Sequence, residues 1–303
     1  MRLFAYQAPT SINEAIALLA DEGRSARPLA GGTDLLVQLR RGSAETDLLV
    51  DVKRIPELNR ISFDPAAGLT IGAAVSCADL CEHPDVQTAY PGLIDAASVM
   101  GGVAIQGRAT LGGNLCNAAP SGDSIPAMIV LGGTCTIAGP RGTRTVPVEA
   151  FCTGPGETVL DRGEMLISIH LPAPAPNSGA RYVRFTPRRE MDIAVAGAGA
   201  WIVLSTDHTT ITDGRIALAA VAPTPLLVTA ANAALITRSP TEEAFAEAAK
   251  LAQQAARPIT DVRGTEVQRR HLVGILVKRA LRGAVSRAKE HCPEAVEGGT
   301  SNG

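Results

Sequence analysis

The chain has 303 residues and a formal net charge of −2, and 46% of its residues are hydrophobic but only 3% aromatic. Its length predicts two or three domains, and its near-neutral charge argues against a nucleic-acid or membrane-surface role. No stretch reaches the roughly 20 uninterrupted apolar residues of a membrane span, and no secretory signal follows the N-terminus. We therefore expect a cytoplasmic protein whose cores are built from Ala, Val, Leu and Ile.

The six cysteines and five histidines are scattered along the chain. No two cysteines form a C-x-x-C pair, and no group of four has the spacing of zinc or iron–sulfur ligands. The sequence therefore predicts free thiols that are mostly buried, and no metal in this chain.

The first fifty residues alternate between strand-like and helix-like segments. Strands and helices are expected in turn at 3–6, 11–20, 26–29, 35–39 and 48–52. Thr10 is predicted to cap the first helix, and Thr33 or Asp34 the second. This alternation is typical of a mixed or parallel sheet.

The pattern changes at residue 58, where a second lobe is expected to begin. Strands are predicted at 58–63, 69–75, 134–138, 145–148 and 164–171, and helices at 76–83, 92–100 and 125–131. The glycines between residues 101 and 113 indicate that this region is not regular helix. The two lobes would cover about 1–57 and 58–176.

Residues 172–179 contain three prolines and one glycine and are predicted to be a linker. Beyond it, three strands are expected at 181–186, 194–204 and 215–221, and two helices at 241–256 and about 264–287. Residues 291–303 are rich in Gly and Glu and are expected to be a disordered tail.

Two Gly-Gly segments about eighty residues apart are the candidate ligand sites. The first is Ala30-Gly-Gly-Thr-Asp34, and the second opens the side-chain-poor stretch 110–123. In the second, Gly112 and Gly113 would let a ligand approach the backbone. Short polar side chains accompany them at Thr110, Asn114, Asn117, Ser121 and Asp123. A tight glycine-rich surface loop is the alternative interpretation.

Neither segment fits the fingerprints of a Rossmann fold or of a P-loop, since G-x-G-x-x-G and G-x-x-x-x-G-K-[ST] are both missing. Neither segment core carries a Lys or Arg. A diphosphate held between the segments would therefore be neutralised by backbone N–H groups and helix dipoles.

Ala30-Gly31-Gly32-Thr33-Asp34 and Thr110-Leu111-Gly112-Gly113-Asn114 together resemble the paired flavin-binding motifs of the FAD-binding medium subunits of molybdenum hydroxylases. This family includes the carbon monoxide dehydrogenase medium subunit and the flavin domain of xanthine dehydrogenase. The resemblance covers nearly the whole chain, including 116–123, 164–172 and 188–194. It implies an α+β fold. A two-lobed α/β FAD-binding domain of the PCMH/VAO type, residues 1–176, would precede a C-terminal domain, residues 177–290, with a three-stranded antiparallel sheet packed on helices.

The resemblance also implies roles for individual residues. The two glycine motifs would surround the FAD diphosphate from opposite sides. Asp123 would accept a hydrogen bond from a ribose or ribitol hydroxyl, and Arg184 would stabilise the reduced, anionic isoalloxazine. The implied cofactor-binding residues are Leu29, Ala30, Gly31, Gly32, Thr33, Asp34, Leu35, Thr110, Gly112, Gly113, Asn114, Asn117, Ser121, Asp123, Leu166, Ile167 and Arg184.

Some of these residues have simpler interpretations that remain open. Asp123 could be a helix N-cap, and Arg184 could be an exposed cation on a strand. Leu29 and Leu35 could be ordinary core residues.

The resemblance implies, finally, one subunit of a larger complex. A large molybdopterin-binding subunit would oxidise the substrate, and a small subunit would carry electrons through two [2Fe–2S] clusters to FAD, in a dimer of heterotrimers. FAD would then reduce NAD⁺, oxygen, a quinone or another acceptor, and this chain would supply no catalytic acid or base. The alternatives are a stand-alone FAD-dependent oxidase or reductase of the same fold, and a scaffold subunit without FAD.

Overall fold

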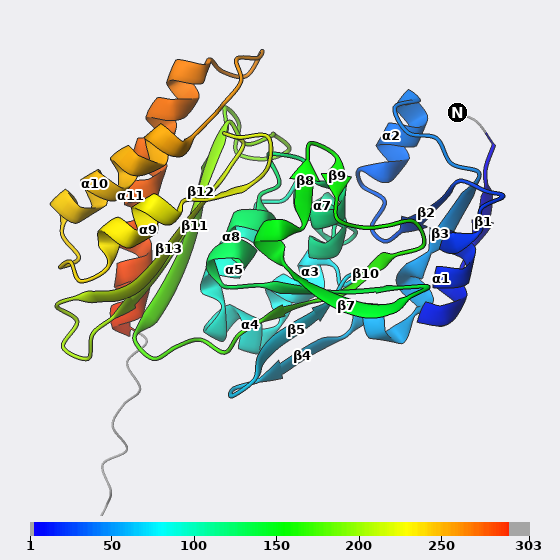
Figure 1. Ribbon diagram of the computed structural model, residues 1–303, viewed down its shortest axis with the longest axis horizontal. Coiled ribbons are helices and arrows are strands. Elements are labelled where there is room, and N and C mark those ends of the chain that lie inside the picture. The colour runs from blue at the N-terminus through cyan, green and yellow to red at the C-terminus, as the bar shows by residue number, and fades with distance from the viewer. Residues whose placement is uncertain (1–2, 291–303) are drawn as a thin grey trace, which may run out of the picture.

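The structure is a computed structural model, and it describes residues 3–290. The predicted tail at 291–303 lies outside this range. The three larger sheets of the described residues follow one another along the long axis of the molecule, from the N-terminal lobe to the helices of the C-terminal region (Figure 1). Within residues 3–290, no helix is both long and apolar enough to cross a membrane.

The first lobe is built on a parallel sheet of order β1-β3-β2. Its elements are β1 (Ala5–Gln7), α1 (Ile12–Ala20), β2 (Ala26–Leu29), α2 (Leu35–Arg41) and β3 (Leu48–Asp51). The predicted alternation is confirmed, but Ser11 rather than Thr10 caps α1, because its side chain accepts the Glu14 N–H.

The second lobe is built on an antiparallel sheet of order β4-β5-β10-β6-β7. Its strands are β4 (Ile61–Asp64), β5 (Gly68–Gly72), β6 (Thr134–Gly139), β7 (Gly142–Pro147) and β10 (Met165–Leu171), with a separate hairpin of β8 (Cys152–Gly154) and β9 (Glu157–Thr158). Short 3₁₀ helices lie at Val52–Arg54, Pro56–Asn59 and Val148–Ala150. The predicted strand start at residue 58 is therefore wrong. Pro56 opens a 3₁₀ turn there, and β4 begins three residues later.

Six short helices pack around this sheet. They are α3 (Cys77–Glu82), α4 (Pro84–Ala89), α5 (Pro91–Ala97), α6 (Val103–Gln106), α7 (Leu111–Asn117) and α8 (Ser124–Val130). The prediction that 101–113 contains no regular helix is wrong, because α6 and the start of α7 lie within it. Thr110 caps α7, and this cap offsets the low helix propensity of the glycines that follow.

The C-terminal region carries an antiparallel sheet of order β11-β12-β13-β14. Its elements are β11 (Ser178–Phe185), β12 (Ala196–Leu204), β13 (Ile211–Ala219), β14 (Leu226–Leu227), α9 (Thr229–Leu235), α10 (Glu242–Ala255) and α11 (Glu266–Glu290). The three predicted strands and both long helices are confirmed. The sequence did not reveal β14, which has only two residues, or α9, which lacks a side-chain cap.

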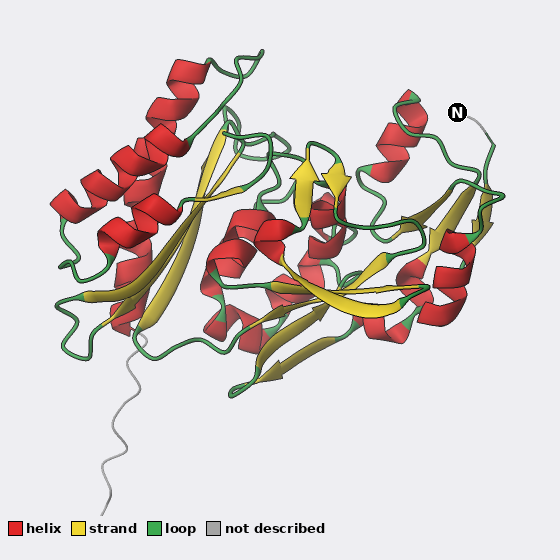
Figure 2. Cartoon of the chain, viewed as in Figure 1, coloured by secondary structure: helices red, strands yellow, loops and turns green. Residues whose placement is uncertain are grey.

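Helices cover both sides of the C-terminal sheet, as Figure 2 shows. On one side α11 lies against β11 and β12, and on the other α5 and α8 of the second lobe pack on the same strands. The approach of α11 is close: a side chain at Gly179 would come within 2.2 Å of the Ala284 carbonyl oxygen. The C-terminal region is thus packed directly onto the second lobe.

The described cysteines, Cys77, Cys81, Cys116, Cys135 and Cys152, are all free, as predicted. Cys77 and Cys135 are buried and the other three are half-buried. Burial raises the pKa of the Cys77 and Cys135 thiols to about 12.

Candidate functional site

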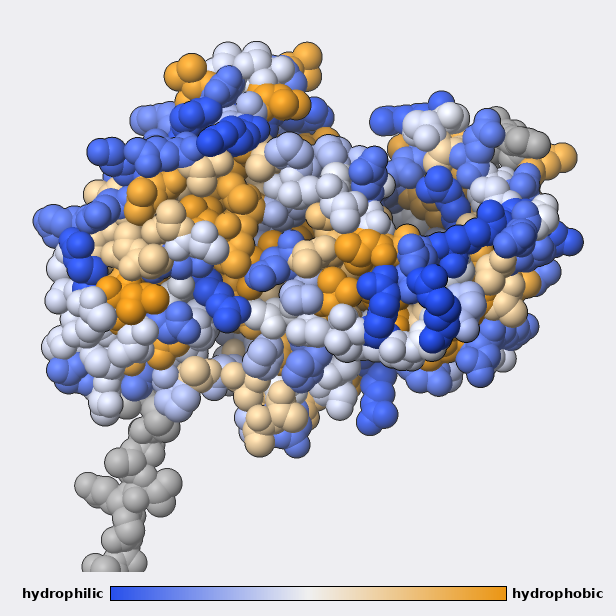
Figure 3. All heavy atoms as spheres, viewed as in Figure 1, coloured by the Kyte–Doolittle hydropathy of each residue, from blue (hydrophilic) through white to orange (hydrophobic). Residues whose placement is uncertain are grey.

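A cavity of about 340 Å³ lies between the two lobes, where α2 and α7 begin. In Figure 3 the surface is notched between the projecting α2 region and the body of the molecule. Most of the predicted site residues line this cavity: Leu29, Ala30, Gly31, Gly32, Thr33, Asp34, Leu35, Thr110, Gly112, Gly113, Asn114, Asn117 and Leu166. The two glycine motifs therefore face one shared space.

The lobes touch at the first glycine motif. A side chain on Gly31 would come within 1.9 Å of the Arg108 carbonyl oxygen, so only glycine fits there. Gly32 has a φ of +79°, which also favours glycine. A hydrogen bond of 2.8 Å from Gln38 Nε2 to Asn117 Oδ1 links the lobes again. The motif combines close backbone contact with an open face toward the cavity.

A lysine that the sequence analysis did not single out supports this motif from behind. Lys53 Nζ donates to the Ala30 carbonyl at 3.0 Å and to Asp51 Oδ1 at 2.6 Å. Tyr6 donates to the other Asp51 oxygen at 2.6 Å. Burial opposes ionisation of Asp51, but the hydrogen bonds from Lys53 and Tyr6 prevail and lower its pKa. The ionised carboxylate thus holds the ammonium against the glycine motif.

The second motif is the first turn of α7 rather than a loop. Thr110 Oγ1 accepts the Gly113 N–H at 2.8 Å, and Ser124 Oγ donates to Asn114 Oδ1 at 2.8 Å. A side chain on Gly112 would come within 2.5 Å of the Ala73 carbonyl oxygen. The absence of a side chain at Gly112 is therefore explained by packing against Ala73, so its substitution would disturb the fold as well as any ligand.

The cavity wall carries two carboxylates. Asp34 precedes α2 but makes no side-chain cap, and burial raises its pKa. Glu164 is paired through both oxygens with Arg144, at 2.9 and 2.6 Å. The hydrogen bonds from Arg144 lower the pKa of Glu164 to about 2. Arg27 also lines the cavity. The wall therefore offers little net positive charge to an anion.

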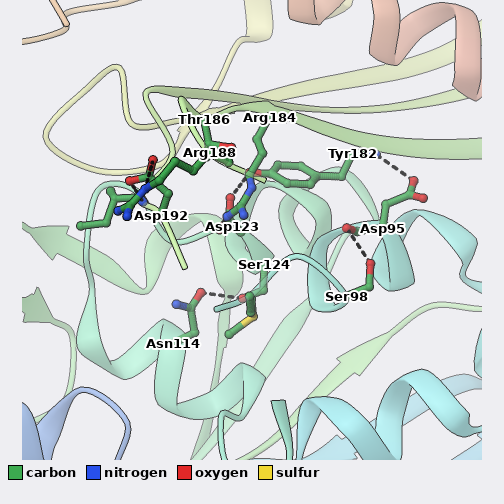
Figure 4. Close-up of polar contacts among 12 residues, drawn as sticks. Asp95, Ser98, Asn114, Asp123, Ser124, Tyr182, Arg184, Thr186, Arg188 and Asp192 are labelled. Atoms are coloured by element: carbon green, nitrogen blue, oxygen red, sulfur yellow. Dashed lines mark hydrogen bonds and ion pairs between the residues drawn. The ribbon is translucent and has the colours of Figure 1, made fainter. Parts of the chain in front are cut away.

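Four predicted site residues, Ser121, Asp123, Ile167 and Arg184, are not part of this cavity wall. Asp123 accepts hydrogen bonds from Tyr182 at 2.7 Å and from Arg184 Nη1 at 2.5 Å (Figure 4). It does not cap α8, and the Arg184 side chain is only 7% exposed, which rules out the interpretation as an exposed cation.

The Asp123 pair is buried and spans two regions of the molecule. Burial raises the pKa of Asp123, and the Arg184 charge and the Tyr182 hydroxyl offset part of that rise. Burial also raises the pKa of Tyr182 well above its usual value. Tyr182 and Arg184 both donate to Asp123, so its carboxyl group acts as the acceptor for two donors from β11. It joins the second lobe to β11.

The remaining wall residues were missed by the sequence analysis. They are Arg27, Pro28, Gln38, Val52, Leu58, Ala73, Met100, Ala109, Cys116, Gly156, Leu160, Glu164 and Met165. Some of them flank the two motifs and could have been inferred from adjacency. Gly156 and Leu160 come from a distant hairpin region and carry no local signal.

A family model described as the FAD binding domain in molybdopterin dehydrogenase matches residues 2–174, and one described as the CO dehydrogenase flavoprotein C-terminal domain matches residues 181–284. The chain is 35% identical to the carbon monoxide dehydrogenase medium chain of Hydrogenophaga pseudoflava over 284 residues, which are 94% of this chain and 98% of that protein. It is 34% identical to a putative xanthine dehydrogenase FAD-binding subunit of Escherichia coli, over 94% of this chain and 97% of that one.

Solved structures agree with these matches. Carbon monoxide dehydrogenase from Hydrogenophaga pseudoflava superimposes with a TM-score of 0.90 at 36% identity, covering 94% of this chain and 98% of that one. Quinoline 2-oxidoreductase from Pseudomonas putida superimposes with a TM-score of 0.88 at 31% identity, covering 95% and 98%.

Proposed function

Because the chain belongs to the family of FAD-binding medium subunits of the carbon monoxide and xanthine dehydrogenases, we propose that it carries electrons from [2Fe–2S] clusters of a partner subunit, through FAD, to an external acceptor. Membership makes it the flavoprotein subunit of an oxidoreductase. The path of the electrons, the partners and the residues that hold the cofactor are the proposal.

The observation that carries the proposal is the convergence of both glycine motifs on one cavity. Gly31 lies against the Arg108 backbone, and Gly113 lines the opposite wall. A side chain at either position would intrude on the contacts that shape this cradle. A long, thin, polar group such as a diphosphate fits a site where backbone rather than side chains forms the walls.

We propose that the thirteen predicted residues in the cavity wall hold FAD. The first turn of a helix leaves N–H groups without intrahelical acceptors. In α7, Thr110 takes the N–H of Gly113, and those of Leu111 and Gly112 would serve the diphosphate. Thr33 would add a hydroxyl donor from the first lobe.

Bound FAD would supply the redox chemistry, accepting electrons from iron–sulfur clusters and passing them on. The chain itself would bind and orient the cofactor and exclude water from it. No acid or base of this chain needs to act on a substrate. Its partners would be a large molybdopterin-binding and a small [2Fe–2S] subunit, in a dimer of heterotrimers in the cytoplasm.

A purified full-length chain tests the cofactor assignment. We expect a flavin absorption spectrum and release of one FAD per chain on denaturation. Copurification with the two proposed subunits, and flavin reduction when the complex receives its substrate, would support the electron path. A complex that oxidises its substrate while the flavin stays oxidised would refute the path, and a colourless chain that takes up no FAD would refute the assignment itself.

Thr33→Val provides a local test that leaves packing intact. The Thr33 side chain is half-buried in the cavity wall, so an isosteric change removes only its hydroxyl. FAD should bind about fivefold to tenfold more weakly, as expected for one lost hydrogen bond. Thr212→Val, on an exposed position of β13, is the matched control and should leave FAD affinity unchanged.

A further inference from the structure

A second cavity, of about 320 Å³, lies where the second lobe meets the C-terminal region. The ends of α4 and α8 and the start of α5 form one side of it. The linker after β10, strands β11 to β13 and the last turns of α11 form the other. It shares no lining residue with the cavity between the lobes. Its volume is at the lower end of the range for sites that bind small molecules.

Arg215 is an unpaired cation in the wall of this second cavity. Within residues 3–290, no hydrogen bond or ion pair engages its guanidinium, which lies over the ring of Trp201 at 5.6 Å from the centroid. The guanidinium also lies against Gly132, where an added side chain would come within 2.8 Å of Nη1. Arg215 is half-buried, and these two contacts hold its guanidinium in place.

The charges around the cavity do not balance. Arg287 also lines it, and pairs with Asp95 at 2.6 and 3.0 Å. Asp95 is shared with Arg181, at 3.0 Å. One carboxylate therefore serves two arginines, and Arg215 adds a third positive charge without a partner in the described structure. The site has an excess of positive charge that an anion would neutralise.

The rest of the wall is apolar, and its polar groups are occupied. The Tyr90 hydroxyl donates to the Pro172 carbonyl at 2.9 Å, and Ser178 Oγ to that of Ala175 at 2.6 Å. Leu131, Pro172 and the ring of Trp201 provide hydrophobic surface. A planar guanidinium matches a carboxylate through two parallel hydrogen bonds. The complementary ligand is thus a small molecule with one carboxylate and an apolar body.

We propose that this second cavity is a binding site for small organic monocarboxylates, anchored by Arg215. The site is independent of the FAD site, so the proposal does not rest on the proposed function. Because residues of both regions line it, a bound ligand stabilises their contact and raises the melting temperature.

Trp201 allows a direct test, since it is the only tryptophan of the chain. The full chain is titrated with sodium benzoate and with benzamide, its uncharged isostere, while Trp201 fluorescence and calorimetric heat are followed. We expect saturable binding of benzoate, with benzamide at least about tenfold weaker because it cannot form the charge-assisted pair. Flavin absorbance should not change.

Two variants and one control locate the site. Arg215→Gln should remove the preference for benzoate over benzamide, whereas Arg279→Gln, an exposed arginine of α11, should retain it. Ala175→Leu, which fills the cavity and keeps Arg215, should block both ligands even if Arg215→Gln folds poorly. If Arg215 only supported the chain at Gly132, after α8, the native chain would not distinguish benzoate from benzamide. That result, or no saturable benzoate signal in the native chain, would overturn the proposal.

Discussion

The molecule has two internal contact zones that are built in opposite ways. The two lobes meet through backbone at Gly31 and Arg108, around an open cavity. The second lobe meets the C-terminal region through carboxylate–arginine pairs, a buried one at Asp123 with Arg184 and a half-buried one at Asp95 with Arg287. The first zone forms its cavity walls largely from backbone at the two glycine motifs. The second zone fixes the position of a sheet through charge pairs, and the cavity at Arg215 lies within it.

The strongest way to break the second zone is Asp123→Ala. It leaves the buried Arg184 guanidinium without its partner, which typically costs about 3–5 kcal/mol. Urea unfolding should show this loss, with FAD affinity of the folded variant affected less than by a change at Gly31. Glu247→Ala, which removes an exposed pair with Arg238, is the control and should cost less than about 1 kcal/mol. An equal loss of unfolding free energy in the two variants would contradict a role of the buried pair in holding the C-terminal region to the second lobe.

In the first zone, Gly31→Ala should disturb the contact between the two lobes. The new methyl group must displace the Arg108 backbone, and overpacking of this kind costs about 1–3 kcal/mol. We expect FAD to bind at least about tenfold more weakly, measured by fluorescence titration of the apoprotein. Gly107→Ala is the matched control, because nothing lies within 4 Å of its added carbon. Far-UV circular dichroism separates a folded chain with poor affinity from an unfolded one, and unchanged affinity in the folded variant would contradict the proposed site.

A smaller effect is expected when the support behind the first motif is removed. Lys53→Met loses the hydrogen bond to the Ala30 carbonyl, and a loss of about 1 kcal/mol would weaken FAD binding about fivefold. Tyr6→Phe keeps Lys53 in place and removes only the second donor to Asp51. FAD affinity should therefore fall for the lysine variant and hardly change for the tyrosine variant. The reverse order would show that Lys53 does not position the motif.

The smallest effect concerns pH. Arg144 holds the pKa of Glu164 at about 2, below its usual 4.5. A lowered pKa in the folded state adds stability that is fully present above pH 4.5 and is lost as the pH falls toward 2. The free energy of unfolding should be measured for both proteins from pH 6 down to pH 3. The amount by which the native chain is more stable than Glu164→Gln should shrink as the pH falls. A difference between the two proteins that stays constant with pH would exclude this pair as the cause.

Local signals in the sequence were sufficient for much of the fold. The strand–helix alternation of the first lobe and the three long C-terminal strands follow from apolar periodicity and end signals, which depend only on nearby residues. The two glycine motifs could also be assigned to one site, although only their resemblance to a family linked them. The short strand β14 and the uncapped helix α9 lack such signals.

What could not be predicted depends on contacts between distant residues. From the sequence, Gly112 looks like part of a loop. In the structure it lies in α7, and Ala73 packs against it. Asp123 looks like a ligand or a cap, but its partners Tyr182 and Arg184 are about sixty residues away in sequence. Lys53 has no motif of its own, and only the folded chain brings it to Ala30.

The buried thiols of Cys77 and Cys135 have a practical consequence. The thiolate is the form that reacts with alkylating agents and peroxide, and a pKa of about 12 leaves almost none of it at neutral pH. Modification of these two side chains must therefore wait until the surrounding structure opens. The labelling rate of each thiol, measured for its peptide by mass spectrometry, therefore reports how often the surrounding core opens locally.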